Sequence, residues 1–280
     1  MVTIRNVPCD ELAAITPQMD GVMQRAYGAA SFAAQIQWYI AVQPDAVVVA
    51  EDHGVVVGTG CGIGYEDAGF GWVGVIATEP GFERRGMGRL VTERVIDSLA
   101  RHGCAPVLDA SLSGGPLYER MGFVDHGLTR IVSREPIASA APVPAITPDD
   151  VADVAAFDRH AFGADRTVLI DVLVQSHAGR TMVVRGSGGE IKGFAVAQAG
   201  VIGPLAAADG NTLSRLVNAA AALPWTRPPQ ICVPPESTHL ATLQELGWRV
   251  TRELRHMLRG IDAVPVRSDL YAGRASLGIG

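Results

Sequence analysis

The chain has 280 residues, which predicts two domains at roughly 150 residues each. Apolar residues make up 48% and charged residues 19%, a composition that excludes intrinsic disorder, and the net charge of −6 argues against a nucleic-acid or anionic-membrane surface. We find no leader pattern and no apolar stretch near the roughly 20 residues of a membrane span, and therefore expect a cytoplasmic protein. The four cysteines are widely spaced, which predicts reduced thiols and no metal site.

In chain order, the first half predicts an alternation of strands and helices. Strands are expected at residues 3–7, 46–51, 55–65, 70–78, 107–110 and 123–132, and helices at 10–27, 31–42, 86–102 and 116–121. This order predicts an α/β (α+β) domain built on a mixed sheet.

A proline-rich connector separates this half from the rest of the chain. Residues 134–148 hold four prolines among small residues, which favours an extended segment over a packed element. Thr147 can then cap a helix that has Pro148 in its first turn. These features predict a first domain at 1–135, a Pro/Ala linker at 136–148 and a second domain at 149–280.

The two halves resemble diverged copies of one unit. The hairpin pattern of residues 47–62 returns at 182–196, and the Gly-Phe pair at 122–123 returns as Gly-Trp at 247–248. Because the matches follow the same order in both halves, they predict a tandem repeat of one fold.

Four glycines alternate within one expected strand and therefore share one face: Gly58, Gly60, Gly62 and Gly64. We favour close packing of a helix against this face over a bare patch left open for a ligand.

The segment at residues 74–90 carries the clearest chemical signal. A β-rich run enters a turn, and Gly86 and Gly88 then open an amphipathic helix. Free amides at a helix N-terminus bind anions, and glycines let a phosphate approach the backbone. Three arginines add positive charge there: Arg84, Arg85 and Arg89. The ligand should therefore carry phosphates, although neither the P-loop nor the dinucleotide fingerprint is present.

Two motifs carry a resemblance to a known family. Residues 80–88 read Pro-Gly-Phe-Glu-Arg-Arg-Gly-Met-Gly, and residues 117–123 read Leu-Tyr-Glu-Arg-Met-Gly-Phe. The sequence here resembles the GNAT superfamily of acetyl-CoA-dependent N-acetyltransferases, and the whole chain resembles its tandem bacterial subgroup. It departs from the family pattern at Glu83, where Gln or Arg is usual, and at Ser111, where many members have Asn.

The resemblance implies a sheet that splays between its fourth and fifth strands, with the CoA arm in the gap. Backbone groups of Ile76, Ala77 and Thr78 would hold the pantetheine and polarise the thioester carbonyl. Ser111 stands at the family's pantetheine contact. The pyrophosphate would lie on the amides from Arg84 to Arg89, a set that comprises Arg84, Arg85, Gly86, Met87, Gly88 and Arg89.

The resemblance also implies a catalytic acid. Tyr118 would protonate the departing thiolate, since a phenol of pKa ~10 is a suitable donor to a thiolate whose acid has a pKa of ~8.5. The alternative is that Tyr118 only packs its helix beneath Phe123.

Other polar and aromatic residues keep two interpretations each. A base must also deprotonate the amine, and no motif selects among His53, Glu66, Asp67, Glu79 and Asp109. His102 is expected to cap a helix C-terminus. Three aromatic residues line either the acceptor pocket or the core: Phe32, Trp38 and Tyr39. Asp165 and Arg166 either reach the acceptor or form a structural ion pair.

The second half lacks the arginine-flanked glycines and has Leu243 at the position of Tyr118. We therefore expect a degenerate copy without its own cofactor site. The predicted function is metal-free transfer of acetyl from acetyl-CoA to a primary amine of a small molecule (amino acid, polyamine or amine antibiotic) by direct attack, in a monomer or homodimer. The alternatives are a protein lysine or N-terminal acetyltransferase and a non-catalytic acyl-CoA-sensing module.

Overall fold

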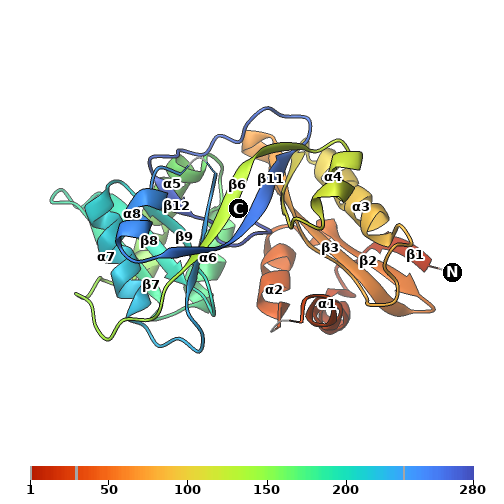
Figure 1. The fold of residues 1–280 in the computed structure, drawn as a ribbon, viewed down its shortest axis with the longest axis horizontal. Helices are drawn as coiled ribbons and strands as arrows, with labels where there is room; N and C mark the ends of the chain where they lie inside the picture. The colour runs from red at the N-terminus through yellow and green to blue at the C-terminus, as the bar shows by residue number, and fades with distance from the viewer. Residues whose placement is uncertain (1, 29–30, 236) are drawn as a thin grey trace.

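The computed structural model describes residues 2–28, 31–235 and 237–280, and the first half of the chain follows the predicted order of elements (Figure 1). Its strands are β1 (Val2–Asn6), β2 (Val47–Asp52), β3 (Val55–Tyr65), β4 (Phe70–Thr78), β5 (Ala105–Ala110) and β6 (Val124–Ser133). Its helices are α1 (Leu12–Tyr27), α2 (Ala33–Val42), α3 (Met87–Arg101) and α4 (Gly115–Arg120). The predicted elements are confirmed, with ends that lie within two residues of the observed ones.

The second half repeats much of this order. Its helices are α5 (Val151–Phe162), α6 (Thr167–Ser176), α7 (Gly210–Ala221) and α8 (Leu240–Glu245). Its strands are β7 (Thr181–Arg185), β8 (Ile191–Ala197), β9 (Ile202–Ala207), β10 (Gln230–Val233), β11 (Arg249–Leu258) and β12 (Tyr271–Gly273). The hairpin β2–β3 corresponds to β7–β8, and Gly122 and Gly247 each connect a short helix to a long strand at φ near +85° (84° and 87°). The tandem repeat is therefore confirmed.

One long strand of each half, β6 and β11, crosses into the other half. The larger sheet has the order β1-β2-β3-β4-β5-β11-β6-β10, and the smaller has the order β12-β9-β8-β7. In the larger sheet β11 pairs antiparallel with β5 on one side and with β6 on the other, while β6 also pairs with β10. Figure 1 shows β6 and β11 side by side between the halves. Strands of both repeats therefore complete one sheet, and the boundaries at 135 and 149 stay a prediction about the repeats.

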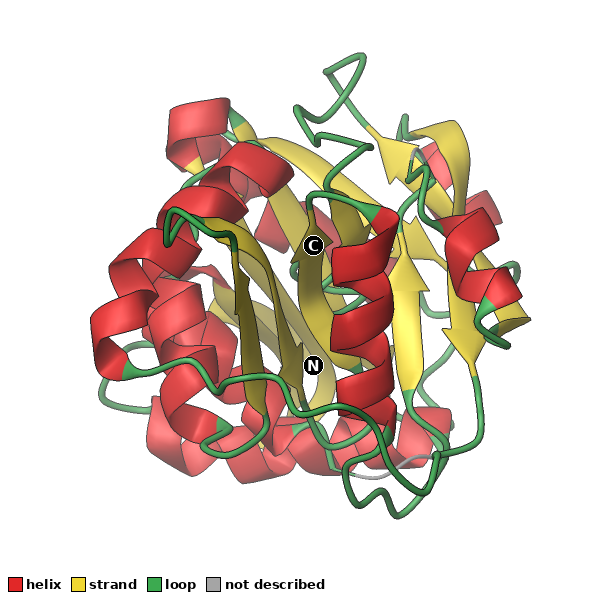
Figure 2. Ribbon diagram, turned by 90° about the vertical axis from the view of Figure 1, so that its left-hand side faces the viewer, coloured by secondary structure: helices red, strands yellow, loops and turns green. Residues whose placement is uncertain are grey.

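Helices cover both faces of the strands (Figure 2). In the first half, Val47 and Val49 of β2 pack in a cluster with α1 and α2, whereas Val48 and Ala50 pack in a cluster with α3. This alternation follows from the two-residue period of a strand. In the described part of the chain, no helix is both long enough and apolar enough to cross a membrane.

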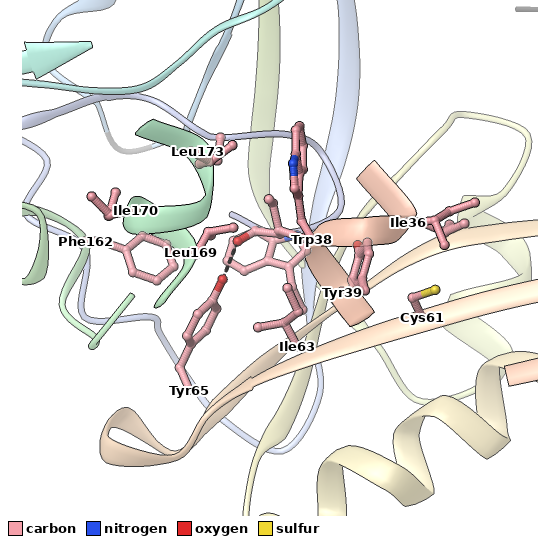
Figure 3. Close-up of a cluster of buried hydrophobic side chains, with 14 of the residues drawn as sticks. Ile36, Trp38, Tyr39, Cys61, Ile63, Tyr65, Phe162, Leu169, Ile170 and Leu173 are labelled. Atoms are coloured by element: carbon pink, nitrogen blue, oxygen red, sulfur yellow. Dashed lines mark hydrogen bonds between the residues drawn. The ribbon is translucent and has the colours of Figure 1, made fainter. Parts of the chain in front are cut away.

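One apolar core extends from the first half into the second (Figure 3). Trp38 and Tyr39 of α2 are 6% and 0% exposed, and they belong to the same buried cluster as Phe162 of α5 and Leu169 of α6. The core interpretation of Trp38 and Tyr39 is therefore confirmed. Phe32 is half-buried at the edge of this cluster, with its ring 6.1 Å from that of Tyr27.

The glycine face of β3 packs directly against α3. A Cβ atom on Gly60 would lie 2.6 Å from a methyl carbon of Val91, and one on Gly62 would lie 3.0 Å from a methyl carbon of Val95. The helix-packing interpretation is therefore confirmed, since side chains there would push α3 away from the sheet.

The linker carries no helix or strand between β6 and Pro148, as predicted. Its backbone bonds to the second half, because Ile137 N donates to Ala221 O at 3.1 Å and Val183 N donates to Pro144 O at 2.9 Å.

Candidate active site

The edges of β4 and β5 separate in the middle of the larger sheet. The two strands pair in parallel only from Phe70–Trp72 to Ala105–Val107, and β5 then continues alongside β11. A bulge in β4 follows at once, since Gly74 pairs with Cys61 but Ala77 pairs with Thr59. Within the bulge Val75 has a φ of +56°, an unusual value for a β-branched residue. The expected splay between the fourth and fifth strands is thus confirmed.

The helix start next to this gap has no protein cap. Gly86 is the N-cap of α3 with a φ of +79°, its side-chain position is empty, and the first turn holds no acidic residue. Within the described residues, the amides of Met87, Gly88 and Arg89 therefore face no acceptor from the protein. A cavity of about 410 Å³ lies over them, lined by Thr78, Phe82, Glu83, Arg84, Gly86, Met87, Gly88, Arg89, Leu117 and Arg120.

Positive charge predominates around this cavity. Arg84, Arg89 and Arg120 line it together with Glu83, and Arg89 also pairs with Glu93 at 2.8 Å, so the arginines exceed the carboxylates by one. Arg85 does not belong to this lining, and its guanidinium lies 5.1 Å from the centre of the ring of Phe82, which does. Uncapped amides and excess cations make this place suited to a phosphate-bearing ligand.

Tyr118 belongs to α4, which borders the same region. Its ring packs edge-on against Phe123 at 5.8 Å, and the residue is half-buried. Burial raises the pKa of the phenol, and the neighbouring phenol of Tyr27 adds to this, while a hydrogen bond with Thr92 opposes it. The hydroxyl therefore stays protonated at neutral pH and is able to donate. Its catalytic role remains a prediction.

The other expected pantetheine contacts lie on both sides of the gap. Tyr27 of α1 donates a hydrogen bond to the Ile76 carbonyl at 2.7 Å, which occupies one of the backbone groups that the sequence analysis placed at the pantetheine. Ser111 follows β5, and its hydroxyl accepts from Gly114 N at 3.1 Å and lies 3.1 Å from the Ser113 hydroxyl. In this structure Ser111 therefore organises the loop that starts α4, and its contact with pantetheine stays a prediction.

Two family models match the chain, and both describe acetyltransferases. The acetyltransferase (GNAT) family matches residues 12–123, and an acetyltransferase (GNAT) domain matches residues 154–272. The chain belongs to the GNAT acetyltransferases. It carries two GNAT domains in tandem, which places it in a family of acyltransferases.

Individual relatives agree with this assignment. The uncharacterized N-acetyltransferase YitH of Bacillus subtilis (strain 168) is 27% identical over 186 residues, a match that spans 63% of this chain and 65% of that relative, less than two thirds of its length. A putative acetyltransferase from Pyrococcus horikoshii superposes with a TM-score of 0.82 at 24% identity, over 100% of this chain and 96% of that chain. A tandem GNAT protein from the clavulanic acid biosynthesis pathway gives 0.63 at 17% identity, over 94% and 100%. Both structural similarities are below 25% sequence identity and therefore concern the fold alone.

The second GNAT domain closes the equivalent gap with its own chain. β9 is bridged to β10 only at Val201 and Gln230, and β12 then pairs with β9 while Arg274, next along the chain, bridges to Cys232 of β10. At α7, the Asp209 side chain caps the helix by accepting from Thr212 N at 2.7 Å. Leu243, at the position of Tyr118, is fully buried in an apolar cluster. The gap between strands and the helix start that are open in the first GNAT domain are therefore occupied by the protein itself in the second.

The segment after β12 runs back against β4 of the first domain. Trp72 Nε1 donates to the Leu277 carbonyl at 3.2 Å, Tyr39 donates to the Gly278 carbonyl, and Tyr65 donates to the Ile279 carbonyl at 2.5 Å. This segment therefore lies on the α1 and α2 side of the sheet, opposite the face that α3 covers.

Asp109, one of the possible bases, is held inside the protein. The carboxylate accepts hydrogen bonds from Arg274 and, at 2.6 Å, from the Thr129 hydroxyl. Burial by itself would raise the pKa of this carboxyl, but the charge of Arg274 and the contacts with His256 and Thr129 outweigh it and lower the pKa to about 2. A carboxylate with this pKa is a poor proton acceptor at neutral pH, which argues against Asp109 as the base.

The remaining possible bases are paired or distant. Glu79 forms a two-pronged ion pair with Arg25, at 2.6 and 2.9 Å. Glu66 and Asp67 lie before Phe70, roughly 26 Å of strand away from Thr78. His53 is in the exposed turn between β2 and β3. The base therefore stays unassigned.

The structural interpretation of Arg166 is confirmed. Its guanidinium makes a fully buried pair with Asp158, at 2.7 and 2.9 Å, and lies 3.7 Å above the Phe162 ring. Asp165 lies just before α6, and its carboxylate accepts from Thr167 N, the first amide of the helix, at 2.9 Å. Neither side chain is directed to the gap between β4 and β5.

Sequence reasoning missed the contribution of β11 to this region. Arg255 of β11 donates to Glu119 of α4 at 2.6 Å and to Asp125 at 2.7 Å. Nothing in the local pattern of the second half indicates a partner in the first, because the pairing of a strand depends on the whole sheet. Tyr27 was also missed, since an aromatic residue at the end of a helix is an ordinary packing residue.

Proposed function

We propose that the first GNAT domain transfers an acetyl group from acetyl-CoA to a primary amine of a small molecule. The observation that carries this proposal is the open gap between β4 and β5 beside the uncapped start of α3. The corresponding places in the second domain are filled by β12 and Asp209, which supports one cofactor site per chain.

The residues around the α3 start fit the pyrophosphate of CoA. Gly86 has open space at its side-chain position, and a Cβ on Gly88 would meet nothing closer than 3.7 Å, so a phosphate can approach the amides closely. Arg84 and Arg89 are placed to neutralise its charge. Backbone groups of the β4 bulge, at Ile76, Ala77 and Thr78, are suited to hold the pantetheine arm.

The proposed chemistry uses a protonated phenol. Acetyl-CoA supplies the thioester whose acetyl carbon becomes bonded to the amine nitrogen. Tyr118 gives its phenolic proton to the sulfur that leaves as the carbon–sulfur bond breaks, and burial of the phenol keeps this proton in place until then. The amine loses its own proton to water or to the unassigned base.

The second half supports a small acceptor. Residues 277–279 bind side chains on the α1 and α2 face of the sheet, and β11 continues the sheet beside β5, which leaves less room for a protein segment than an open groove would. This favours a small-molecule amine over a protein lysine or N-terminus.

The test is thiol release from acetyl-CoA with a panel of primary amines, together with calorimetric binding of CoA. We expect turnover with some of the amines, and Tyr118→Phe should lower kcat about 10²-fold or more with an unchanged Kd for CoA. Turnover that is unaffected by Tyr118→Phe would remove the acid. CoA binding without turnover on any amine would favour a sensor instead.

A further inference from the structure

Arg252 of β11 lies on the face of the sheet that α1 and α2 cover, from which we expect the amine to approach the gap. The side chains of Arg252, Leu254 and His256 alternate onto the same face of β11. The His256 ring stacks on Trp72 at 5.6 Å, and Leu254 packs in a cluster with Leu277. Trp72 and Leu277 lie on the side of the sheet that α1 and α2 cover, so Arg252 is on that side as well.

Arg252 extends past the end of β5. The last residue of β5, Ala110, pairs with Arg255, and Arg252 lies three residues further along β11, about 10 Å away. The positive charge of Arg252 acts on the Tyr27 phenol: desolvation raises the pKa of this phenol, and Arg252 lowers it. The Tyr27 hydroxyl donates a hydrogen bond to the Ile76 carbonyl in the β4 bulge. Arg252 is therefore near the bulge, where we expect the amine to meet the thioester.

Among the described residues, the neighbouring charges on β11 are paired but that of Arg252 is not. Its neighbour Glu253 pairs with Arg130 at 3.2 Å, and Arg255 pairs with Glu119 and Asp125. No carboxylate of residues 2–28, 31–235 or 237–280 forms an ion pair with Arg252, whose side chain is exposed. Directly after β4, Glu79 pairs with Arg25 at 2.6 Å.

We propose that Arg252 selects acceptor amines that carry a carboxylate, as an amino acid does, over polyamines and simple amines. This deepens the proposed acetyl transfer and rests on it. A guanidinium binds a carboxylate through two parallel charge-assisted hydrogen bonds, whereas it repels a second ammonium group. The second half would thus contribute the specificity of a site whose cofactor contacts lie in the first.

The test compares acceptors that differ only in the carboxylate: L-phenylalanine with 2-phenylethylamine, and L-lysine with cadaverine. We expect the amino acid of each pair to have the higher kcat/KM. Arg252→Gln should lower kcat/KM for the amino acids by about 10- to 100-fold and change it less than about twofold for the decarboxylated amines. Arg249→Gln, an exposed arginine on the same strand, is the matched control and should change neither.

A binding measurement keeps this inference separate from the proposed activity. With CoA present, N-acetyl-L-phenylalanine should raise the Tm of the native protein more than N-acetyl-2-phenylethylamine, and Arg252→Gln should abolish the difference. A preference for the decarboxylated ligands, or an equal loss for both members of a pair in Arg252→Gln, would overturn the role of Arg252. Failure of turnover alone, with the binding difference intact, would count against the transfer and not against this selectivity.

Discussion

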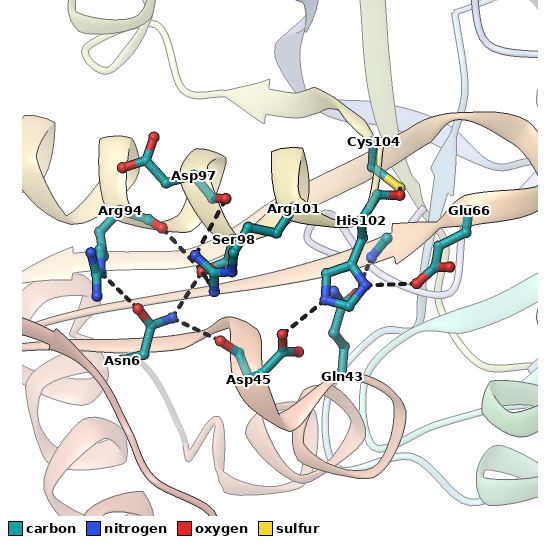
Figure 4. A network of polar contacts seen from close by, with 11 residues as sticks. Asn6, Gln43, Asp45, Glu66, Arg94, Asp97, Ser98, Arg101, His102 and Cys104 are labelled. Carbon is teal, nitrogen blue, oxygen red and sulfur yellow. Dashed lines mark hydrogen bonds and ion pairs between the residues drawn. The ribbon is translucent and has the colours of Figure 1, made fainter.

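His102 connects the end of α3 to two short turns, at residues 44–46 and 66–68, at one edge of the first domain (Figure 4). His102 is the C-cap of α3, as expected from the sequence, and its two ring nitrogens lie 2.7 Å from Glu66 Oε1 and 2.8 Å from Asp45 Oδ2. Both nitrogens can donate only in the imidazolium form. The hydrogen bond to Asp45 and the one to Glu66 outweigh desolvation and raise the pKa of His102 above its ordinary value of 6.5.

This arrangement predicts a pH dependence of stability. A group with a raised pKa in the folded state stabilises the protein fully below its unfolded pKa of about 6.5, and the contribution is lost as pH rises through the folded value. We therefore expect His102→Gln to lower the urea midpoint more at pH 6 than at pH 9. Urea unfolding at both values, with the exposed His53→Gln as control, measures this. An equal loss at pH 6 and pH 9 would contradict the imidazolium assignment.

At the scale of elements, α4 depends on a strand from the other repeat. The helix has only 6 residues, too few to be stable alone, and Arg255 of β11 binds both Glu119 on it and Asp125 just after it. A side chain on Gly115 would collide with this arginine. The position of Tyr118 therefore depends on the second half, whereas the start of α3, where we propose that CoA binds, does not.

Loss of the contact between Arg255 and α4 should affect kcat and CoA affinity to different extents. We expect Arg255→Met to lower kcat about tenfold by loosening α4, with a smaller loss of CoA affinity, because α4 contributes only Leu117 and Arg120 to the cavity and the α3 amides are untouched. Stopped-flow turnover and calorimetry give the two quantities, and Arg249→Met is the control. A loss of CoA affinity as large as the loss of kcat would contradict this separation.

At the scale of the whole molecule, the reciprocal exchange of β6 and β11 makes the repeats interdependent. Without its partner, each half would expose an unpaired sheet edge and part of the shared core around Trp38 and Phe162. Fragments 1–135 and 149–280 should each lack a cooperative unfolding transition when made alone. Co-expression should restore a complex with near-ultraviolet circular dichroism like that of the intact chain. A fragment that unfolds cooperatively by itself would contradict this interdependence.

The sequence was sufficient for local elements and insufficient for this exchange. The alternation of β3 and the helical spacing of α3 are properties of neighbouring residues, and both elements were predicted within two residues. The open helix start of α3 was also predictable, because glycines and arginines at a helix start act locally. The pairing of β11 with β5 brings together His256 and Asp109, which are 147 residues apart, and no pattern in either segment specifies the other.

The gap that β12 fills in the second domain shows that the two repeats can change in sequence independently of each other. In a symmetric pair of identical subunits, each substitution appears twice, so a change that closes one cavity closes both. Covalent joining of the repeats removes this constraint: β12 can occupy one gap while the other remains open. The two repeats of the chain can thereby diverge, and under the proposed function one would carry out catalysis while the other would form the wall that selects the amine.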